Sequence, residues 1–476
     1  MHWLLNWSAL RWARGAFLAV SMVVAGLNVS HTEPWWRNGV NEAHRQFGPS
    51  TNAEESVVIS FVDPAIARLI RRPAYVSPRP AKPLKPADQK KLAKAASDYF
   101  TADAQRRAVW QFPSGLDRLV KQNEPAARQA VWEAYRSAPI HGPMKEDFAT
   151  NSVRFGPHLS AYTVKPVGAK PAAGWPLFIA MHGGGNAPKR VNDSQWKVMQ
   201  GYYRDHPEIG GYLYVALRAP NDTWNGFYDD YVYPLIANLI QQFALFGDVD
   251  VNKTFIMGYS HGGYGAFAIG PKMPDHFAAI HASAGAPTDG ETVAHTLRNT
   301  VFTYMIGEKD TAYGRIDRCR KFNDTVEALR SGRDDIYPVQ MQFIAGNGHT
   351  GLPDRDKIVE MYPAVRNPVP RELTWLMTDK VIRNFFWLGT ASPGKEQEIK
   401  ASCRSNKVVL TGSKVAKASL YLDARLIDLD QPVSLTVNGR ALPPQKVKPR
   451  LGTLCRTMLD RTDPELTFSV EIPIEF

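Results

Sequence analysis

Short apolar runs alternate with helical segments through the middle of the chain. The apolar runs fall at 159–167, 176–181, 212–217, 254–257, 278–282, 301–306 and 339–344. The clearest helix is predicted at 230–246, where Leu235, Leu239 and Phe243 recur every four residues. Buried strands that alternate with helices are typical of a mostly parallel sheet covered on both faces. The pattern therefore predicts an α/β domain at 151–395.

Beyond residue 393 the hydrophobic period changes from 3.6 to 2. Val433, Leu435 and Val437 alternate with polar residues and lead into Asn438-Gly439, a hairpin signal. Residues 468–476 repeat this alternation. We expect a small antiparallel β-domain at 400–476, arranged as a sandwich.

Residues 31–150 form a connector and a helical extension. The connector is stiffened by five prolines, Pro73, Pro78, Pro80, Pro83 and Pro86. Helical composition follows at 87–109 and 115–137, and Pro125 is expected to break the second segment. We expect the extension to pack against the main domain, with lining of a substrate entrance as the alternative.

The first 30 residues have the pattern of a signal peptide. Arg11 and Arg14 precede an apolar run at 16–27, which is short for a membrane span. This pattern predicts export, to the periplasm or out of the cell. The alternative is an uncleaved membrane anchor through residues 15–30, because no clear A-x-A cleavage site follows.

Charge and cysteine content exclude other classes of protein. The 476 residues carry a net charge of +11, but the basic residues are dispersed apart from 71–94, and no nucleic-acid motif accompanies them. We therefore predict solvated surface and no nucleic-acid partner. Three cysteines are too few for a disulfide scaffold; Cys403 and Cys455 could form one bridge in an oxidising compartment, and Cys319 is expected to be a buried thiol.

A glycine-flanked serine follows the strand predicted at 254–257. The segment reads KTFIMGYSHGGYGAF, which places Ser260 between Gly258 and Gly262 in a G-x-S-x-G pattern. Small residues at both glycine positions let a strand turn sharply into a helix and expose the serine hydroxyl. Ser260 is the predicted nucleophile; the alternative interpretation is a glycine-rich turn with an incidental serine.

A glycine-rich loop follows the strand predicted at 176–181. It reads MHGGGN, and consecutive glycines can aim backbone NH groups at a developing negative charge. We predict an oxyanion hole formed by Gly183 and Gly184, completed by the backbone NH of His261. His182 is expected to brace the loop.

An acid and a histidine follow two later strands. Asp310 comes after the strand predicted at 301–306, and His349 comes after the strand at 339–344. The chain order serine, acid, histidine is that of α/β-hydrolase triads. His349 would accept the proton of Ser260, and Asp310 would orient the imidazole and stabilise its charged form.

Each of these two assignments has an alternative. Glu308 and Asp317 are the other candidate acids beside Asp310. His281 also lies near the end of a strand. That strand is the first one after the sharp turn at Ser260, so His281 comes too early in the chain order to replace His349.

The loop after the strand at 212–217 is rich in aromatic residues. It reads NDTWNGFYDDYVY, and its candidate substrate-binding residues are Trp224, Phe227 and Tyr228. The alternative is a packed loop in which Asp229 or Asp230 caps the next helix. No cluster has metal-ligand spacing and no nucleotide fingerprint is present, so no metal and no cofactor are predicted.

Residues 151 to about 395 resemble secreted α/β-hydrolase esterases of the polyhydroxybutyrate depolymerase and feruloyl esterase type. The resemblance rests on MHGGGN, DVDVNKTFIMGYSHGGYGAF, IGEKD and GNGH. It implies an α/β-hydrolase fold, cofactor-free serine esterase chemistry, an ester substrate that is small, polymeric or cell-wall linked, and a setting outside the cytoplasm. Two other functions stay open: a prolyl-oligopeptidase-like peptidase, and a surface binding protein with an idle hydrolase core.

Overall fold

The computed structural model describes residues 82–476. The predicted signal peptide or anchor at 1–30 and the connector as far as residue 81, with Pro73, Pro78 and Pro80, lie outside the described residues. Among the helices at 82–476, none is both long and apolar enough to cross a membrane.

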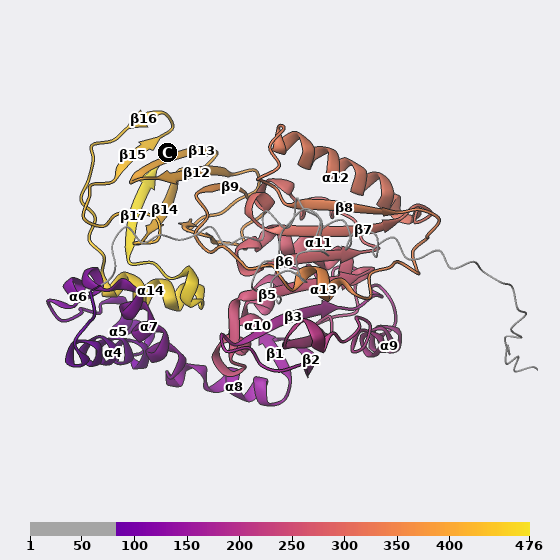
Figure 1. Ribbon diagram of the computed structural model, residues 1–476, viewed down its shortest axis with the longest axis horizontal. Coiled ribbons are helices and arrows are strands. Elements are labelled where there is room, and N and C mark those ends of the chain that lie inside the picture. The colour runs from indigo at the N-terminus through magenta and orange to yellow at the C-terminus, as the bar shows by residue number, and fades with distance from the viewer. Residues whose placement is uncertain (1–81) are drawn as a thin grey trace, which may run out of the picture. The chain divides into compact units, whose positions relative to one another are not determined.

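An eight-stranded sheet forms the middle of the chain (Figure 1). Its spatial order is β1-β2-β4-β3-β5-β6-β7-β8; β1 and β2 run antiparallel to their neighbours and all later strands are parallel. With the strand-to-helix turn after β5, this arrangement confirms the predicted α/β-hydrolase fold. The strands are β1 (Ser152–Phe155), β2 (His158–Val167), β3 (Trp175–Met181), β4 (Tyr212–Leu217), β5 (Val249–Tyr259), β6 (Ala279–Ser283), β7 (Val301–Gly307) and β8 (Val339–Ile344).

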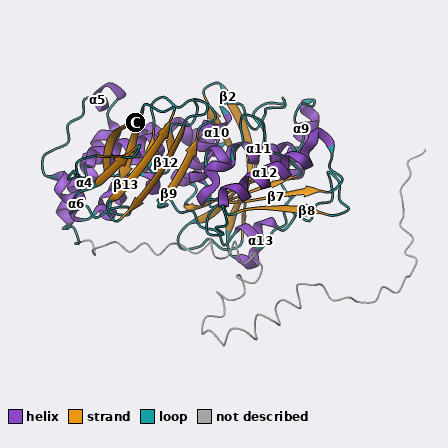
Figure 2. Cartoon of the chain, turned by 90° about the horizontal axis from the view of Figure 1, so that it is seen from above, coloured by secondary structure: helices purple, strands orange, loops and turns teal. Residues whose placement is uncertain are grey.

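Helices cover both faces of this sheet (Figure 2). Because side chains alternate along a strand, Leu177 and Ile179 of β3 face one core, whereas Phe178 and Ala180 face the other. The first core contains side chains of α10 (Val232–Phe246), α11 (His261–Lys272) and α12 (Arg315–Arg330). The second contains side chains of α9 (Lys189–Met199) and α13 (Lys357–Met361).

Within residues 82–476, five α-helices precede the sheet, and α4, α6 and α7 among them pack against the end of the chain. They are α4 (Pro86–Thr101), α5 (Ala104–Ala108), α6 (Leu116–Gln122), α7 (Glu124–Arg136) and α8 (Gly142–Ala149). Pro125 lies in the first turn of α7 and so separates it from α6. Leu92, Phe100 and Val131 share an apolar core with Leu454 and Met458 of the late helix α14 (Leu451–Arg461). Contact with the hydrolase domain comes mainly through α8, which meets β1 and α10.

Two sheets enclose the C-terminal core. The strands are β9 (Glu372–Leu376), β10 (Asn384–Phe385), β11 (Leu388–Gly389), β12 (Glu398–Arg404), β13 (Lys407–Ser413), β14 (Lys417–Leu422), β15 (Ser434–Val437), β16 (Arg440–Ala441) and β17 (Val470–Glu475). They form a five-stranded sheet, β16-β15-β13-β12-β9, and a four-stranded sheet, β10-β11-β14-β17. Short 3₁₀ helices connect elements throughout: η2 (Pro139–His141), η3 (Pro207–Ile209), η4 (Pro274–His276), η5 (Ala294–Asn299), η6 (Ala312–Gly314) and η7 (Pro464–Leu466).

This β-rich unit differs from the sequence expectation in three ways. It begins at β9, before the predicted boundary at 400, because β9 supplies the edge partner of β12. One of its strand pairs, β13 with β15, is parallel. It also includes the helix α14 before its last strand. The hairpin expected at Asn438-Gly439 does join β15 to β16, and both turn residues have positive φ, 47° and 78°.

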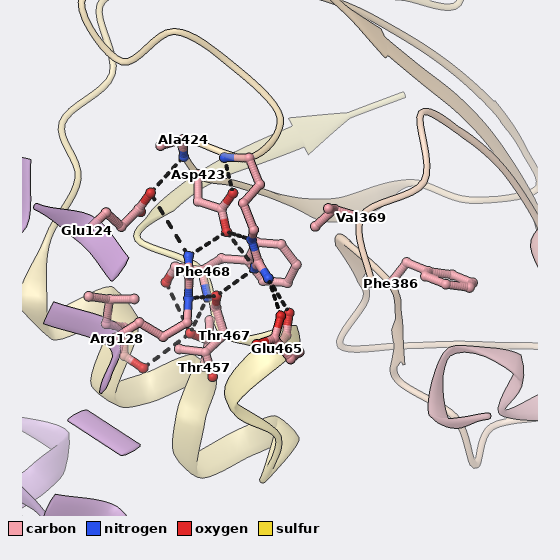
Figure 3. A network of polar contacts seen from close by, with 12 residues as sticks. Glu124, Arg128, Val369, Phe386, Asp423, Ala424, Thr457, Glu465, Thr467 and Phe468 are labelled. Atoms are coloured by element: carbon pink, nitrogen blue, oxygen red, sulfur yellow. Dashed lines mark hydrogen bonds and ion pairs between the residues drawn. The ribbon is translucent and has the colours of Figure 1, made fainter. Parts of the chain in front are cut away.

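Buried charges join the N-terminal helices to the C-terminal unit (Figure 3). Arg128 of α7 donates to Asp423 Oδ2 at 2.9 Å, and Asp423 also accepts from Arg425 Nε at 2.9 Å. Glu124 accepts the backbone NH of Ala424 at 2.7 Å. Since removing one partner from such a network leaves an uncompensated buried charge, these contacts require the two regions to stay together.

The three cysteines are buried and unbridged. The bridge considered between Cys403 and Cys455 is therefore not formed. Burial raises the pKa of Cys403 to about 11 and that of Cys319 to about 12. These thiols are protonated at neutral pH, which makes them poor nucleophiles.

Candidate functional site

Ser260 stands on a strained turn between β5 and α11. Its φ of 55° and ψ of −113° lie outside the regions that side-chain-bearing residues usually adopt. A Cβ at Gly258 would lie 2.1 Å from the carbonyl oxygen of Gly262, and a Cβ at Gly262 would lie 2.1 Å from that of Met181. The two glycines of the predicted elbow are thus needed because backbones approach closely there.

The structure brings Ser260, His349 and Asp310 into one hydrogen-bonded series. Ser260 Oγ lies 2.9 Å from His349 Nε2, and His349 Nδ1 lies 2.9 Å from Asp310 Oδ2. A carboxylate can only accept, so Nδ1 carries the proton and Nε2 is left to accept from the serine hydroxyl. This arrangement can perform general-base activation of a serine nucleophile.

The alternative candidates lie elsewhere. Glu308 accepts the backbone NH of Gly346 at 2.7 Å, which ties the loops after β7 and β8 together. Asp317 is almost fully exposed on α12. His281 is buried between Thr303 and Ser283, and burial holds the pKa of its imidazole well below the usual value.

Arg315 is a site residue that the sequence analysis missed. Its Nε donates to Asp310 Oδ1 at 3.0 Å and its Nη2 donates to the same oxygen, while His349 uses Oδ2. The turn between acid and arginine is tight, with positive φ at Tyr313 (55°) and Gly314 (64°). Both carboxylate oxygens are therefore engaged, which fixes the orientation of Asp310. An arginine five residues after the acid is a signal, but a weak one, because surface arginines are common on helices.

The glycine loop after β3 lies beside Ser260. A Cβ at Gly183 would be 3.5 Å from the Cβ of Ser260, and Gly184 has a φ of 109°. The NH of Gly185 is already donated to Asn192 Oδ1 at 2.8 Å, which anchors the loop to α9. Gly183 thus adjoins the serine, and Gly184 follows it in the same loop, against Asn192.

Two buried neutral histidines lie beside this loop. His182 Nδ1 donates to the carbonyl of Gly183 at 2.6 Å, and its Nε2 accepts the NH of Ala219 at 3.0 Å. His261 Nε2 donates to the carbonyl of Trp224 at 2.9 Å. Burial lowers the pKa of His182 to about 3 and that of His261 to about 4, so both rings are uncharged at neutral pH.

The three aromatic residues predicted to bind substrate have different positions. Trp224 is 36% exposed and lies above the first turn of α11, where its ring is 5.4 Å from that of Tyr264. Phe227 is fully buried against His182 and His261, so its predicted contact with substrate is wrong in this structure; it packs beneath the site instead. Tyr228 is 6% exposed and lines an adjoining hollow.

Metal ligation was not predicted from the sequence. Across residues 82–476, no group of three or more His, Cys, Asp or Glu side chains is arranged to hold a metal ion.

Comparison with known proteins gives matches at the level of structure. No family model and no curated protein matches the chain. A thermostable esterase matches with a TM-score of 0.33 and 16% identity, over 41% of this chain and 54% of the esterase. LpqC, a poly(3-hydroxybutyrate) depolymerase from Bordetella parapertussis, matches with a TM-score of 0.30 and 15% identity, over 40% of this chain and 79% of LpqC.

A ferulic acid esterase from Anaeromyces mucronatus, AmCE1/Fae1A, matches with a TM-score of 0.27 and 12% identity, over 43% of this chain and 90% of that protein. Each of these matches is a distant similarity in structure over less than half of this chain. The strand order and the elbow at Ser260, rather than these distant matches, define its fold.

Proposed function

We propose that this protein is a serine hydrolase that cleaves carboxylic esters through an acyl-enzyme intermediate. The observation that carries the proposal is the hydrogen-bonded series from Ser260 through His349 to Asp310, with 2.9 Å at each step. All three residues follow parallel strands of one sheet, where ligand crevices form in α/β folds.

The proposed reaction has two halves. His349 Nε2 takes the proton of Ser260 as its oxygen attacks the ester carbonyl, and the NH groups of Gly183, Gly184 and His261 stabilise the resulting oxyanion. His349 then protonates the departing alkoxide as the carbon–oxygen bond breaks. Water, deprotonated by His349, releases the acid and restores the serine. No cofactor takes part in these steps.

Hydrolysis of matched substrates tests this proposal. The rate of hydrolysis of acetyl, butyryl and feruloyl esters would be measured beside that of peptidyl amides. We expect turnover of esters alone, with Ser260→Ala lowering it by a factor on the order of 10⁶. Ser97→Ala, an exposed helical serine, is the matched control.

Other results would favour the other candidate functions. Cleavage of amides would point to a peptidase. If the folded protein hydrolysed none of these substrates, a binding role would be favoured. Full turnover by Ser260→Ala would exclude Ser260 as the nucleophile.

We also propose that the protein works outside the cytoplasm, because its first 30 residues have the pattern of an export signal. N-terminal sequencing of the protein purified from its native cells tests this point. A new N-terminus near residue 30 is expected, whereas an intact start in the membrane fraction would indicate an anchor.

A further inference from the structure

A hollow of about 710 Å³ adjoins the proposed active site. We propose that it binds a positively charged group of alkylammonium type carried by the ester substrate. This inference rests on the proposed function and adds a substrate class to it. Its lining combines aromatic rings with carboxylates: Trp224, Tyr228, Asp229, Asp230, Asp289 and Glu291 are the members that matter.

The hollow begins next to the nucleophile. The carbonyl of Trp224 accepts a hydrogen bond from the side chain of His261, the residue after Ser260. The Trp224 ring also lies 5.4 Å from the ring of Tyr313, which follows Asp310 by three residues. A group bound against Trp224 would therefore lie beside the turns that carry Ser260 and Asp310.

An aromatic face is exposed at this entrance. Trp224 is 36% exposed and Tyr313 is 68% exposed. The guanidinium of Arg315 already lies 5.3 Å from the centre of the Tyr313 ring, so Trp224 provides the open face. The negative face of an indole attracts cations more strongly than that of any other side chain.

The charge of the lining is negative and only partly compensated. Glu291 pairs with the buried Lys272, and Asp289 lies 4.0 Å from Arg318. Within residues 82–476, neither Asp229 nor Asp230 has a cationic partner within 4.0 Å. Asp229 instead accepts from the neutral amide of Asn221 at 2.9 Å. The negative charge of this lining contrasts with the net charge of +11 on the whole chain.

Tyr228 adds an aromatic ring to this hollow. Its side chain is more than nine-tenths buried, and its hydroxyl oxygen is enclosed by protein beside Trp224. The oxygen atoms that can face a positive charge in the hollow are therefore those of the carboxylates. Aromatic rings and oxygen atoms around one hollow are the combination that recognises alkylammonium groups.

A pair of isosteric esters tests the inference. Butyrylcholine and 3,3-dimethylbutyl butyrate have nearly the same shape, but only the first carries a charge. We expect kcat/KM to favour the choline ester by about tenfold, as a desolvated cation–π contact with nearby carboxylates implies. Asp230→Asn and Trp224→Leu should each lower this ratio severalfold, whereas Asp205→Asn, an exposed aspartate paired with Lys165, should not.

A binding measurement separates this inference from the proposed function. Titration of Ser260→Ala with choline, followed by tryptophan fluorescence, should show saturable binding that Asp230→Asn weakens. Equal kcat/KM for the two esters together with no choline binding would overturn the cation site, and ester hydrolysis would stand. Choline binding without turnover of any ester would overturn the proposed function and leave the cation site in place.

Discussion

Asp310 is held from both sides, by His349 at one carboxylate oxygen and by Arg315 at the other. We therefore expect Arg315→Met to act on catalysis although the arginine does not touch substrate. Asp310 Oδ1 would then be buried without a partner, so the carboxylate could rotate and lose its hydrogen bond to the His349 imidazole. The expected result is a fall in kcat of about tenfold or more with little change in KM.

The control for Arg315→Met is Arg320→Met, in which the arginine is more than half exposed on the same helix, α12. An unchanged kcat in Arg315→Met would show that Asp310 keeps its orientation without the arginine.

Gly184 tests the loop that is proposed to bind the oxyanion. A Cβ there would lie 2.3 Å from Asn192 Oδ1, and the φ of 109° is unfavourable for any other residue. Gly184→Ala should therefore displace the loop and lower kcat about 10²–10³-fold, the loss expected for one oxyanion donor. Gly201→Ala is the matched control, since a Cβ at that glycine meets nothing within 4 Å. Equal activity of the two variants would argue against the assigned hole.

At the residue scale, the sequence could indicate reactive residues that come directly after a predicted strand. Ser260, Asp310 and His349 were named because each follows a predicted strand in hydrolase order. Phe227 was misplaced because loop aromatics serve equally well as substrate contacts and as packing, and only burial distinguishes them. Arg315 could not be identified because its role depends on how the turn at Tyr313 and Gly314 returns the chain to Asp310.

At the element scale, the inner strands of the main sheet were predictable because they are buried on both faces. Their apolar runs stand out from the polar loops on either side, as for β4 and β7, whereas the edge strand β1 is short and largely exposed and was not predicted. The helix α14 was not predicted because it has only 11 residues, and its apolar stripe of Leu451, Leu454 and Met458 lies between alternating strands. The N-terminal helices find their partner in this late helix, which no local pattern reveals.

The packing of α14 gives a stability prediction. Leu454 is fully buried in the core that α14 shares with α4 and α7. Leu454→Ala should lower the free energy of unfolding by about 2–5 kcal/mol, because it leaves a cavity between elements from the two ends of the chain. Urea unfolding followed by circular dichroism measures this, with the exposed Val109→Ala as control. A loss below about 0.5 kcal/mol, the usual effect of a surface substitution, would mean that the helices do not depend on this core.

At the scale of the whole molecule, buried neutral histidines make stability depend on pH. The folded-state pKa values of His182 and His261, about 3 and about 4, lie below the unfolded value of about 6.5. Between these limits the unfolded chain binds more protons than the folded chain. The free energy of unfolding should then fall by about 1.4 kcal/mol per pH unit for each histidine as pH drops from 6.5 toward 4.

His182→Gln tests this linkage, because the Gln side chain is still able to accept from the NH of Ala219. We expect the slope of unfolding free energy against pH between 5.5 and 4 to decrease by about 1.4 kcal/mol per unit. Chemical unfolding at a series of pH values gives the slope. The same slope in both proteins would mean that His182 is not held neutral by the fold.

The C-terminal unit depends on contacts with residues that lie outside 400–476. Its core includes β9, and its helix α14 packs on the N-terminal helices. A fragment of residues 400–476 would expose both contacts, so a binding role for this region is best tested in the full chain.

The central claim is that Ser260 becomes acylated during ester cleavage. The most direct measurement is intact-protein mass spectrometry after rapid mixing with p-nitrophenyl butyrate, with peptide mapping of any adduct. We expect one butyryl group on the peptide that contains Ser260, formed within the burst of nitrophenol release and absent from Ser260→Ala. A burst with the adduct on another residue, or hydrolysis that persists in Ser260→Ala, would contradict it.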